Sequence, residues 1–157
     1  MTMFRTFGVC TLVLSWSGIA LAQDPVKVAP THYKVLIDNA SVRVLKIDYA
    51  PKDKSPMHQH PEAIVIPLTS SKVLFGLPDG KSQEQDLASE AAMYMPAGAH
   101  SPTNIGSTRV DAILVEFKGA VPGKAILPAS RPGIAMKAIA EGARATAYRA
   151  TSDATFS

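Results

Sequence analysis

Short runs of apolar and β-branched residues, separated by turn-forming residues, dominate the chain from about Tyr33 to Lys118. In the run over 42–49, charged residues alternate with apolar ones with one change of phase, as in a strand with one face toward a core. No part of this region carries the sustained period of about 3.6 residues that an amphipathic helix requires. The pattern therefore predicts an all-β sandwich or barrel. The expected strands cover residues 33–37, 42–50, 63–68, 72–77, 82–87, 91–95 and 109–117.

The sharpest local signal is a turn between two of these runs. Pro78, Asp79 and Gly80 separate the run over 72–77 from the run over 82–87. An Asp-Gly pair between two strand-like runs is typical of a tight β-hairpin, because both residues tolerate the positive φ angles of such turns. We expect these two runs to pair as antiparallel neighbours.

The composition changes after Lys118, and residues 120–157 form an extension rich in Gly, Pro and Ala. Its end weakly repeats the start of the predicted barrel at a constant offset. One interpretation is a second copy of the domain that stops before its site, and the other is an extra strand or short helix on the outside of the barrel. We favour the second, because a lone first strand could not bury its own apolar face. The matched positions are Lys34, Ile37, Asp38, Ala40 and Lys46 with Lys137, Ala140, Glu141, Ala143 and Arg149.

Residues 1–22 are typical of a secretory signal peptide. Arg5 precedes an apolar run over 9–21, no acidic residue is present, and small residues at Ala20 and Ala22 predict cleavage after Ala22. A transmembrane anchor is the alternative, but polar residues and a glycine interrupt the run, which is shorter than the roughly 20 residues that span a bilayer. We therefore expect no stable membrane anchor, and residues 23–31 are predicted to be a linker.

The chain's one cysteine, Cys10, lies inside the predicted signal peptide. Cleavage would leave a mature chain with neither a disulfide nor a thiol nucleophile. This is compatible with an oxidising compartment, so we expect a periplasmic or secreted protein.

Composition and charge narrow the function classes. The chain has 157 residues, of which 46% are hydrophobic and 18% are charged, which suits one globular domain with a real core. The formal net charge is +3, and the basic residues are scattered among acidic ones rather than gathered in a stripe. A nucleic-acid partner is therefore not expected, and a small-molecule ligand is.

Two histidines one residue apart begin the candidate chemistry. On a strand, alternate side chains share one face, so His58 and His60 are expected to point the same way. A later corner contains Pro96 and Gly98, which predict a tight turn that delivers His100 onto the following strand. Together the three imidazoles would supply three nitrogen ligands around a metal ion with open coordination positions.

With these two segments the chain resembles the cupins, whose first motif holds HxH and whose second holds PxG, a histidine and then an asparagine. The resemblance covers residues 32–119 and implies a cupin-type jelly roll, that is, a double-stranded β-helix barrel. It also implies a metal centre at the three histidines, and a homodimer, because cupins often pair barrels edge to edge. The matching residues are His58, His60, Pro96, Gly98, His100 and Asn104.

The chain departs from the cupin pattern at the motif glutamate. Cupins usually carry it four or five residues after the second histidine, where this chain has Ile64 and Val65. Glu62 is the nearest carboxylate and shares the histidines' parity, but Pro61 can break the alternation. Two interpretations stay open, a metal ligand or a group at the rim that acts through a neighbour, and we lean toward the second. The second motif is also one residue shorter than usual before His100.

The missing glutamate has a chemical consequence. Three neutral imidazoles leave the charge of a divalent ion uncompensated, which favours an anionic substrate such as an enolate or catecholate. Resemblance to three-histidine cupins makes a metal-dependent dioxygenase the leading hypothesis, with quercetinase-like and isomerase-like reactions open. A non-catalytic module that binds a metal or small ligand is the main alternative, and a barrel with a degenerate site is a third. Fe, Mn, Ni, Cu and Zn all suit these ligands.

Other residues receive weaker interpretations. His32 is expected to be solvated or capping, and Asn104 to orient a turn or a ligand. Tyr94 is either a substrate donor or a surface residue, and Glu116 is assigned no role, near a solvent-facing strand end. Three methionines flank the motifs and would line an adaptable apolar cavity or fill the core. They are Met57, Met93 and Met95.

Overall fold

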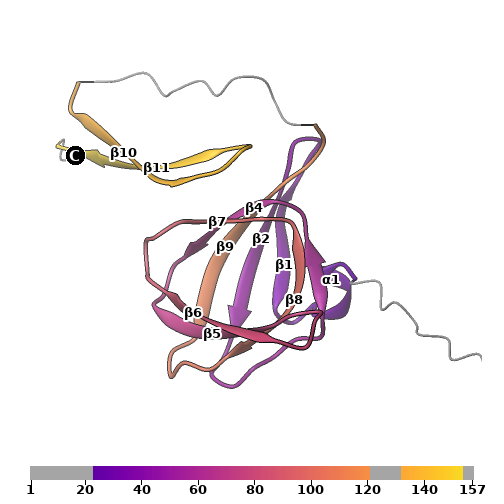
Figure 1. Ribbon diagram of the computed structural model, residues 1–157. Coiled ribbons are helices and arrows are strands. Elements are labelled where there is room, and N and C mark those ends of the chain that lie inside the picture. Colours follow the sequence, from indigo (N-terminus) through magenta and orange to yellow (C-terminus); the bar gives the residue numbers. More distant parts are fainter. Residues whose placement is uncertain (1–22, 121–131, 154–157) are drawn as a thin grey trace, which may run out of the picture.

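Two curled antiparallel β-sheets face each other in the computed structural model, which describes residues 23–120 and 132–153 (Figure 1). The predicted signal peptide, residues 1–22, lies outside the described residues. In the described ranges no helix is long and apolar enough to cross a membrane. The all-β prediction is confirmed.

The first sheet has five strands in the order β1-β2-β9-β4-β7, and the second has four in the order β3-β8-β5-β6. Every pairing within these sheets is antiparallel. The order places strands that are distant in sequence side by side, as in a jelly roll. The bounds are Tyr33–Asp38 (β1), Val42–Tyr49 (β2), His58–His60 (β3), Ala63–Pro67 (β4), Ser71–Gly76 (β5), Ser82–Leu87 (β6), Met93–Met95 (β7), Gly98–Asn104 (β8) and Val110–Phe117 (β9).

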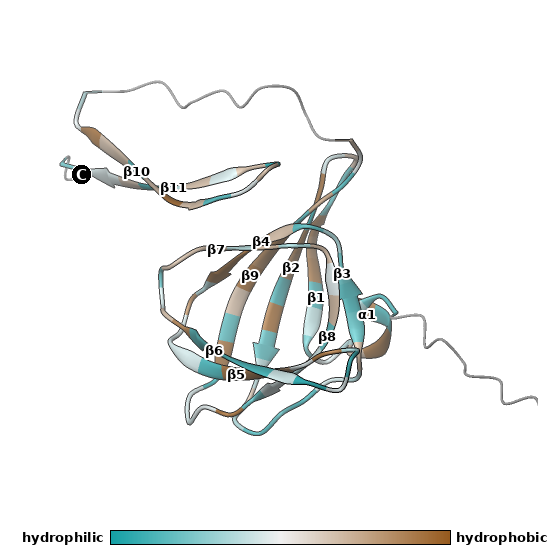
Figure 2. Cartoon of the chain, in the orientation of Figure 1, coloured by the Kyte–Doolittle hydropathy of each residue, from teal (hydrophilic) through white to brown (hydrophobic). Residues whose placement is uncertain are grey.

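The core lies between the sheets and follows from alternation along the strands. Strand β9 is central in the first sheet, paired with β2 and β4, and its residues are alternately buried and half-buried along the whole length. Leu45 on β2 and Leu114 on β9 pair in register and are at most 1% exposed. Apolar and polar residues accordingly alternate along these strands in Figure 2. Burial of each of these leucine side chains contributes about 1.5–3 kcal/mol to the free energy of unfolding.

The predicted hairpin is confirmed. Strands β5 and β6 pair from Gly76 opposite Ser82, and the turn between them places Gly80 at a φ of 82°. That angle lies in the left-handed region, which glycine adopts without steric cost. The Asp79 carboxylate accepts a hydrogen bond from the backbone N–H of Lys81 at 3.0 Å, which stabilises the turn.

Residues 23–31, which the sequence predicts to be a linker, contain local structure. They contain a one-turn helix, α1 (Pro25–Val28), whose N-cap Asp24 accepts a hydrogen bond from the Val26 N–H at 2.9 Å. Pro25 and Ala29 are buried, and Ala29 belongs to the hydrophobic core. Proline at the first helical position and aspartate at the cap are both favourable there, so this segment is part of the barrel.

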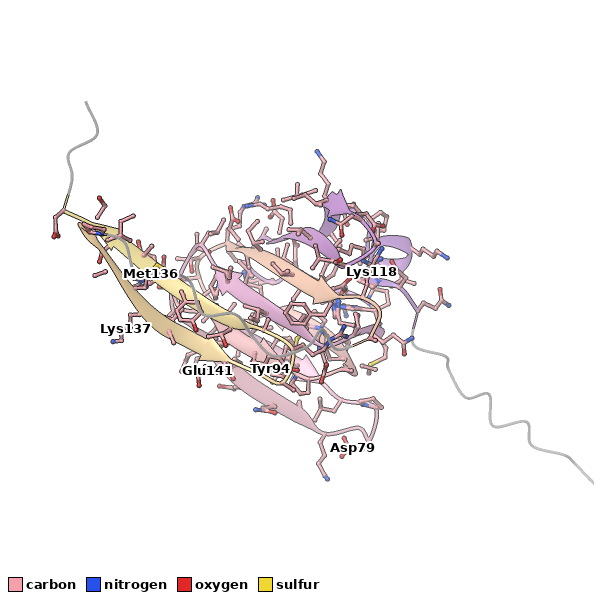
Figure 3. All side chains as sticks on the ribbon, turned by 90° about the horizontal axis from the view of Figure 1, so that it is seen from above. Asp79, Tyr94, Lys118, Met136, Lys137 and Glu141 are labelled. Carbon is pink, nitrogen blue, oxygen red and sulfur yellow. The ribbon has the colours of Figure 1, made fainter. Side chains whose placement is uncertain are left out.

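Residues 132–153 form a third, two-stranded sheet rather than the extra strand or short helix that we favoured. Its strands are β10 (Ile134–Glu141) and β11 (Thr146–Ser152), which pair antiparallel. The turn end of this C-terminal hairpin lies against the barrel beside β7, as Figure 3 shows from above. Much of the rest of the hairpin is exposed, and an isolated two-stranded hairpin is only marginally stable in water. Its position therefore depends on the contacts at its turn.

Three residues make those contacts. Arg144 donates hydrogen bonds at 2.8 Å to the carbonyl oxygens of Lys118 and Gly119, just past the end of β9. Gly142 lies against the ring of Tyr94 on β7, so closely that an added Cβ would come within 1.9 Å of a ring carbon. Arg149 donates to the carbonyl oxygen of Glu90. A side chain at residue 142 would displace the hairpin or the ring.

Candidate metal centre

Strand pairing brings the three predicted histidines together. His58 lies directly opposite His100 in the register of β3 and β8, and His60 lies opposite Gly98. The ring centroids are 5.0 Å apart for His58–His60 and His58–His100, and 5.3 Å apart for His60–His100. One nitrogen of each ring lies within 4.8 Å of the others, so the three rings could hold one metal ion.

The corner before β8 is not what delivers His100 to the site, although the sequence predicts that it is. Gly98 is not among the described residues with a positive φ, and it already pairs with His60 as an extended strand residue. His100 reaches the site because β8 runs antiparallel to β3 and places it across from His58, not because Gly98 forms a left-handed turn. Register, more than the corner, therefore positions the third ligand.

Burial keeps two of the rings neutral. Burial lowers the pKa of His58 to about 4, even though a hydrogen bond to Pro56 opposes it. Burial and the two neighbouring histidines lower the pKa of His100 to about 3. Both rings are therefore uncharged near neutral pH, which is the form that binds metal ions. The donor set fits a divalent transition metal with open positions.

Hydrogen bonds fix which nitrogen faces the cluster. His58 Nδ1 lies 2.8 Å from the carbonyl oxygen of Pro56, which can only accept, so Nδ1 carries the proton and Nε2 has the free lone pair. His60 Nδ1 lies 2.6 Å from Oε1 of Glu116 and donates to it, which leaves Nε2 of His60 as its ligand atom. Both rings are thus held in the tautomer that a metal requires.

Glu116, to which the sequence assigned no role, is the main correction at this site. Its side chain is 1% exposed and lies inside the barrel rather than toward solvent. Burial would raise the pKa of Glu116, but hydrogen bonds from His60 and Arg43 outweigh it and hold the pKa below its ordinary value. The sequence contains an indication of this burial. Glu116 falls on the same alternate positions of its strand as Val110, Ala112 and Leu114, which are buried.

Arg43 and Asp24 extend this interaction to the barrel's edge. Arg43 on β2 donates through Nε to Glu116 and through a terminal nitrogen to Asp24, the cap of α1. The hydrogen bond with Glu116 raises the pKa of Arg43 further above its ordinary value. The buried carboxylate is therefore fully paired, which a buried charge requires.

Glu62 lies away from the three rings. It falls between the end of β3 at His60 and the start of β4 at Ala63, so strand alternation does not determine where its side chain points. Its carboxylate is 34% exposed and lies 3.8 Å from Nε of Arg144 in the C-terminal hairpin. In this structure Glu62 is not in the metal-binding group, and Glu116 is the carboxylate that contacts a histidine.

Tyr33 is a second residue that the sequence did not single out. It is the first residue of β1, its side chain is buried, and its hydroxyl lies 3.0 Å from Nε2 of His58. Tyr49 packs edge-on against Tyr33 and donates a hydrogen bond to Oγ of Ser55 at 2.8 Å. No motif marks Tyr33, because its role follows from the distant pairing that places β1 beside the site. His32 stacks on Tyr49 and is not a ligand.

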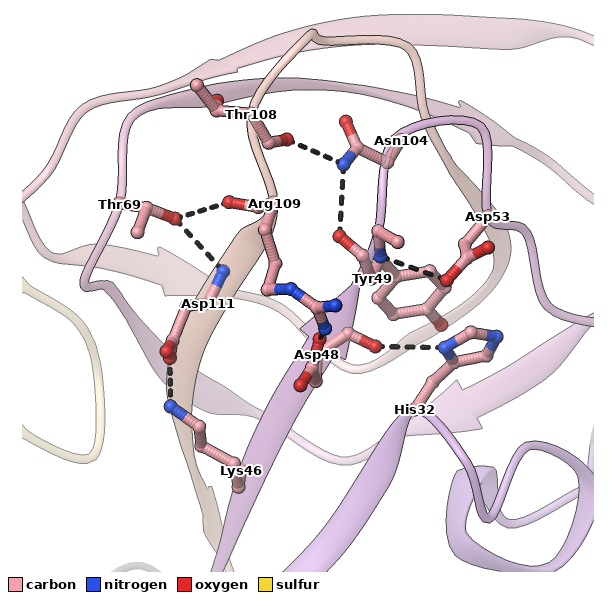
Figure 4. Close-up of polar contacts among 11 residues, drawn as sticks. His32, Lys46, Asp48, Tyr49, Asp53, Thr69, Asn104, Thr108, Arg109 and Asp111 are labelled. Atoms are coloured by element: carbon pink, nitrogen blue, oxygen red, sulfur yellow. Dashed lines mark hydrogen bonds and ion pairs between the residues drawn. The ribbon is translucent and has the colours of Figure 1, made fainter.

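Asn104 has the orienting role that was expected. Its amide nitrogen donates to the carbonyl oxygens of Tyr49 and Thr108 (Figure 4). Its side-chain oxygen accepts from the Gly106 N–H at 2.9 Å. Nearby, the exposed side chains of Arg109 and Asp48 form an ion pair. Asn104 thus ties the end of β8 to β2 and holds the second motif in place.

An apolar cavity of about 70 Å³ adjoins the histidines inside the barrel. Tyr33, His60 and His100 form part of its wall, and most other lining residues are aliphatic or aromatic. Met93 and Met95 line it, as expected for an adaptable wall, and also line an outer groove that reaches His100. The two methionines therefore separate the interior from that groove.

Solved structures resemble this chain in fold. A cupin domain from Bordetella pertussis is 27% identical, with a TM-score of 0.52 over 55% of this chain and 92% of that chain. A cupin superfamily protein from Desulfitobacterium hafniense is 15% identical, with a TM-score of 0.43 over 55% of this chain and 76% of that chain. No protein-family model matches the chain, and no curated protein matches it. On its strand order and the Bordetella structure, the described barrel has the double-stranded β-helix fold of the cupin superfamily.

Proposed function

We propose that this chain binds a divalent transition metal through His58, His60 and His100 and acts as a metal-dependent dioxygenase on a small anionic substrate. One observation carries the proposal: three imidazoles have ligand atoms within 4.8 Å of one another, and two of them, His60 and His100, line an apolar cavity. A metal held there would supply a Lewis acid and, if redox-active, a one-electron centre. The chain's own residues would position the metal, keep water away from it and limit the size of the substrate.

The charge around the site supports an anionic substrate. Burial keeps His58 and His100 neutral, and the buried Glu116 is already paired with Arg43. A divalent ion would therefore keep most of its charge in a surrounding of low polarity, where it attracts an anion strongly. Enolates and small carboxylates provide such a charge on oxygen atoms, which iron and manganese accept readily.

The cavity volume limits the size of the substrate. A cavity of about 150 Å³ is needed to hold benzene in a rigid apolar core. The cavity here has about half that volume, about 70 Å³. A short diketone enolate would fit with a modest shift of Met93 and Met95, whereas a flavonol would require the sheets to separate. We infer that short, flexible substrates are preferred over polycyclic ones.

A non-catalytic module that captures a metal or a small anion is the second candidate. The observation that favours it is the small apolar cavity, which suits retention of a ligand as well as turnover. A cluster of ligands does not by itself prove a reaction.

Metal content tests the first step. The mature chain should be purified from its own compartment, and bound metals should be measured by elemental analysis in the wild type and in His60→Ala. We expect one transition metal per chain in the wild type and a large loss in the variant. His32→Ala is the matched control, because His32 is half-buried, stacks on Tyr49 and lies outside the cluster. Equal metal in the wild type and His60→Ala would rule out the proposed centre.

Oxygen uptake tests the reaction. An oxygen electrode should be used with the metal-loaded protein and a panel of short diketones, flavonols and thiols. Consumption with a short diketone that is lost in His100→Ala would support a dioxygenase. Metal binding without consumption across the panel would favour the capture module instead.

We also propose that the protein is exported and cut after Ala22. In support, Gln23, which would then be the first residue, already pairs with β3: its carbonyl oxygen accepts from the Gln59 N–H at 3.1 Å. Mass spectrometry of the periplasmic protein should find Gln23 at the amino terminus, and an intact leader would contradict export.

A homodimer is proposed through the edge strand β1. Three consecutive apolar residues there, Val35, Leu36 and Ile37, are 40–52% exposed. An exposed apolar edge strand favours pairing with another chain. Light scattering should give twice the chain mass, and a charged substitution at Leu36 should give the monomer; a wild-type monomer would refute it.

A further inference from the structure

The hydroxyl of Tyr33 occupies the lone pair that a metal needs. It lies 3.0 Å from His58 Nε2, and because His58 Nδ1 donates to Pro56, Nε2 must accept and Tyr33 must donate. The Tyr33 ring centroid also lies within 5.5 Å of the His58 and His60 ring centroids. The phenol is therefore directed at the centre of the cluster.

Metal binding would take this acceptor away. Once the lone pair of His58 Nε2 coordinates a metal, the Tyr33 hydroxyl loses its partner, yet its side chain is only 3% exposed and cannot turn to bulk water. A buried hydroxyl without a partner is costly, so the donor must find another acceptor nearby. Two acceptors would lie beside it: the hydroxyl oxygen of Tyr49, which packs against Tyr33, and the ligand in the open coordination position, which carries the negative charge and is the stronger acceptor.

Other polar groups on the cavity wall are already committed. The Tyr49 hydroxyl donates to Ser55, and the Asn104 amide donates to two backbone carbonyls. Among the described lining residues, Tyr33 is the hydrogen-bond donor whose partner is itself a metal ligand. The rest of the wall is almost entirely apolar.

We propose that Tyr33 donates a hydrogen bond to an anionic ligand that binds at the three-histidine site, and so selects anions over neutral ligands there. The inference rests on the proposed metal centre and names the residue that recognises what binds to it. Tyr33 would contact the ligand directly, whereas Glu116 acts through His60.

Azide is a suitable probe because it is a triatomic anion that fits the cavity and changes the visible spectrum of cobalt. The full mature chain should be loaded with Co(II), and azide should be titrated into the wild type and Tyr33→Phe. We expect azide to bind about tenfold more weakly to the variant, since one hydrogen bond to a charged group is lost. Imidazole, a neutral ligand, should bind both proteins within about twofold. Tyr94→Phe, whose hydroxyl lies under the C-terminal hairpin, is the matched control and should bind azide like the wild type.

Cobalt affinity provides a second readout. In Tyr33→Phe no hydroxyl competes for Nε2 of His58, so Co(II) should bind as tightly as in the wild type or more tightly. Equal azide affinity in the wild type and Tyr33→Phe would overturn the proposal, as would equal weakening of azide and imidazole. If the wild type bound no Co(II), the proposed metal centre itself would fail, which separates the two failures.

A gentler substitution covers the case in which Tyr33→Phe does not fold. Site-specific 3-fluorotyrosine at residue 33 keeps the ring and makes the hydroxyl a stronger donor. Azide affinity should then rise relative to the wild type. An unchanged or lower affinity would also overturn the proposal.

Discussion

His60 donates from Nδ1 to Oε1 of Glu116 over 2.6 Å, and each side chain is 1% exposed. A carboxylate behind a ligating imidazole fixes its tautomer and raises its basicity. The chain lacks the glutamate that cupin motifs usually place among the ligands. Its buried carboxylate is instead Glu116 on β9, which contacts the ring of His60 and does not lie among the proposed ligands.

Glu116→Gln should weaken metal binding by about 10- to 100-fold, because the amide keeps the size of the side chain but loses its charge. Competition with a chromophoric chelator would measure this change. Glu84→Gln is the control, since Glu84 is exposed on β6 and pairs with Lys72 at the surface. Unchanged affinity in Glu116→Gln would show that the carboxylate has no influence on the ligand.

Acid should destabilise the metal-free protein well above the pH at which carboxylates titrate. The folded-state pKa values of His58 and His100 are lowered to about 4 and about 3, so the unfolded chain binds more protons below its own histidine pKa of about 6.5. Their contribution is complete above pH 6.5 and falls as pH decreases toward 4, by up to about 1.4 kcal/mol per pH unit for each group.

Urea unfolding of the chelator-treated protein at pH 7 and pH 5 would measure this loss. His100→Gln, which retains a polar side chain but cannot titrate, should show a smaller difference between the two pH values. A free energy of unfolding that stays constant over this range would refute the predicted proton linkage.

Gly142→Ala should release the C-terminal hairpin from the barrel. The new Cβ would come within 1.9 Å of the Tyr94 ring, and we expect the marginally stable hairpin to move rather than the ring, which is packed on the barrel. Hydrogen exchange over residues 134–152 should accelerate strongly, while exchange in β2 and β9 should change little.

Removal of the obstructing ring gives the control. The double variant Gly142→Ala with Tyr94→Ala should restore much of the slow exchange in the hairpin, because Arg144 still bonds the carbonyl oxygens past β9. Slow exchange in the single variant would mean that the clash is relieved by another movement.

Met93→Ala should broaden the range of ligands. Met93 lines both the interior cavity and the outer groove, so a smaller side chain enlarges the cavity and its opening. Relative to the wild type, phenyl-substituted diketones should gain more in binding or turnover than the shortest diketone. Met136→Ala, an exposed change in the hairpin, is the control. An equal change for both diketones would argue that Met93 does not limit size.

The sequence predicts more of the fold than of the site's surroundings. Alternation and the Asp79–Gly80 turn identify strands because these are local effects. The two motifs also identify the three rings, because each motif is a short local pattern that can be read from the sequence. Tyr33 was missed because its position depends on pairing between distant segments, which no local pattern reveals. The helix at residues 25–28 was missed because a single turn is too short to show a helical period, although Asp24 and Pro25 are favourable start residues.

Glu116 is a different kind of miss. Its parity matched the buried residues of β9, but a carboxylate is rarely buried unless paired, so solvent was the natural expectation. Its partners Arg43 and His60 lie on β2 and β3, and the alternation alone could not show that all three converge. The same limit applies to Glu62, whose direction depends on Arg144 in a distant hairpin.

The cavity beside the histidines is enclosed by residues that also hold the two sheets together, among them Leu114, Val73 and Tyr49. Any variant that widens it removes packing from the same core, at about 2–5 kcal/mol for a leucine reduced to alanine. Selectivity and thermal tolerance are therefore coupled in this barrel. A catalyst evolved toward bulkier compounds would need compensating substitutions elsewhere before it tolerated the new shape.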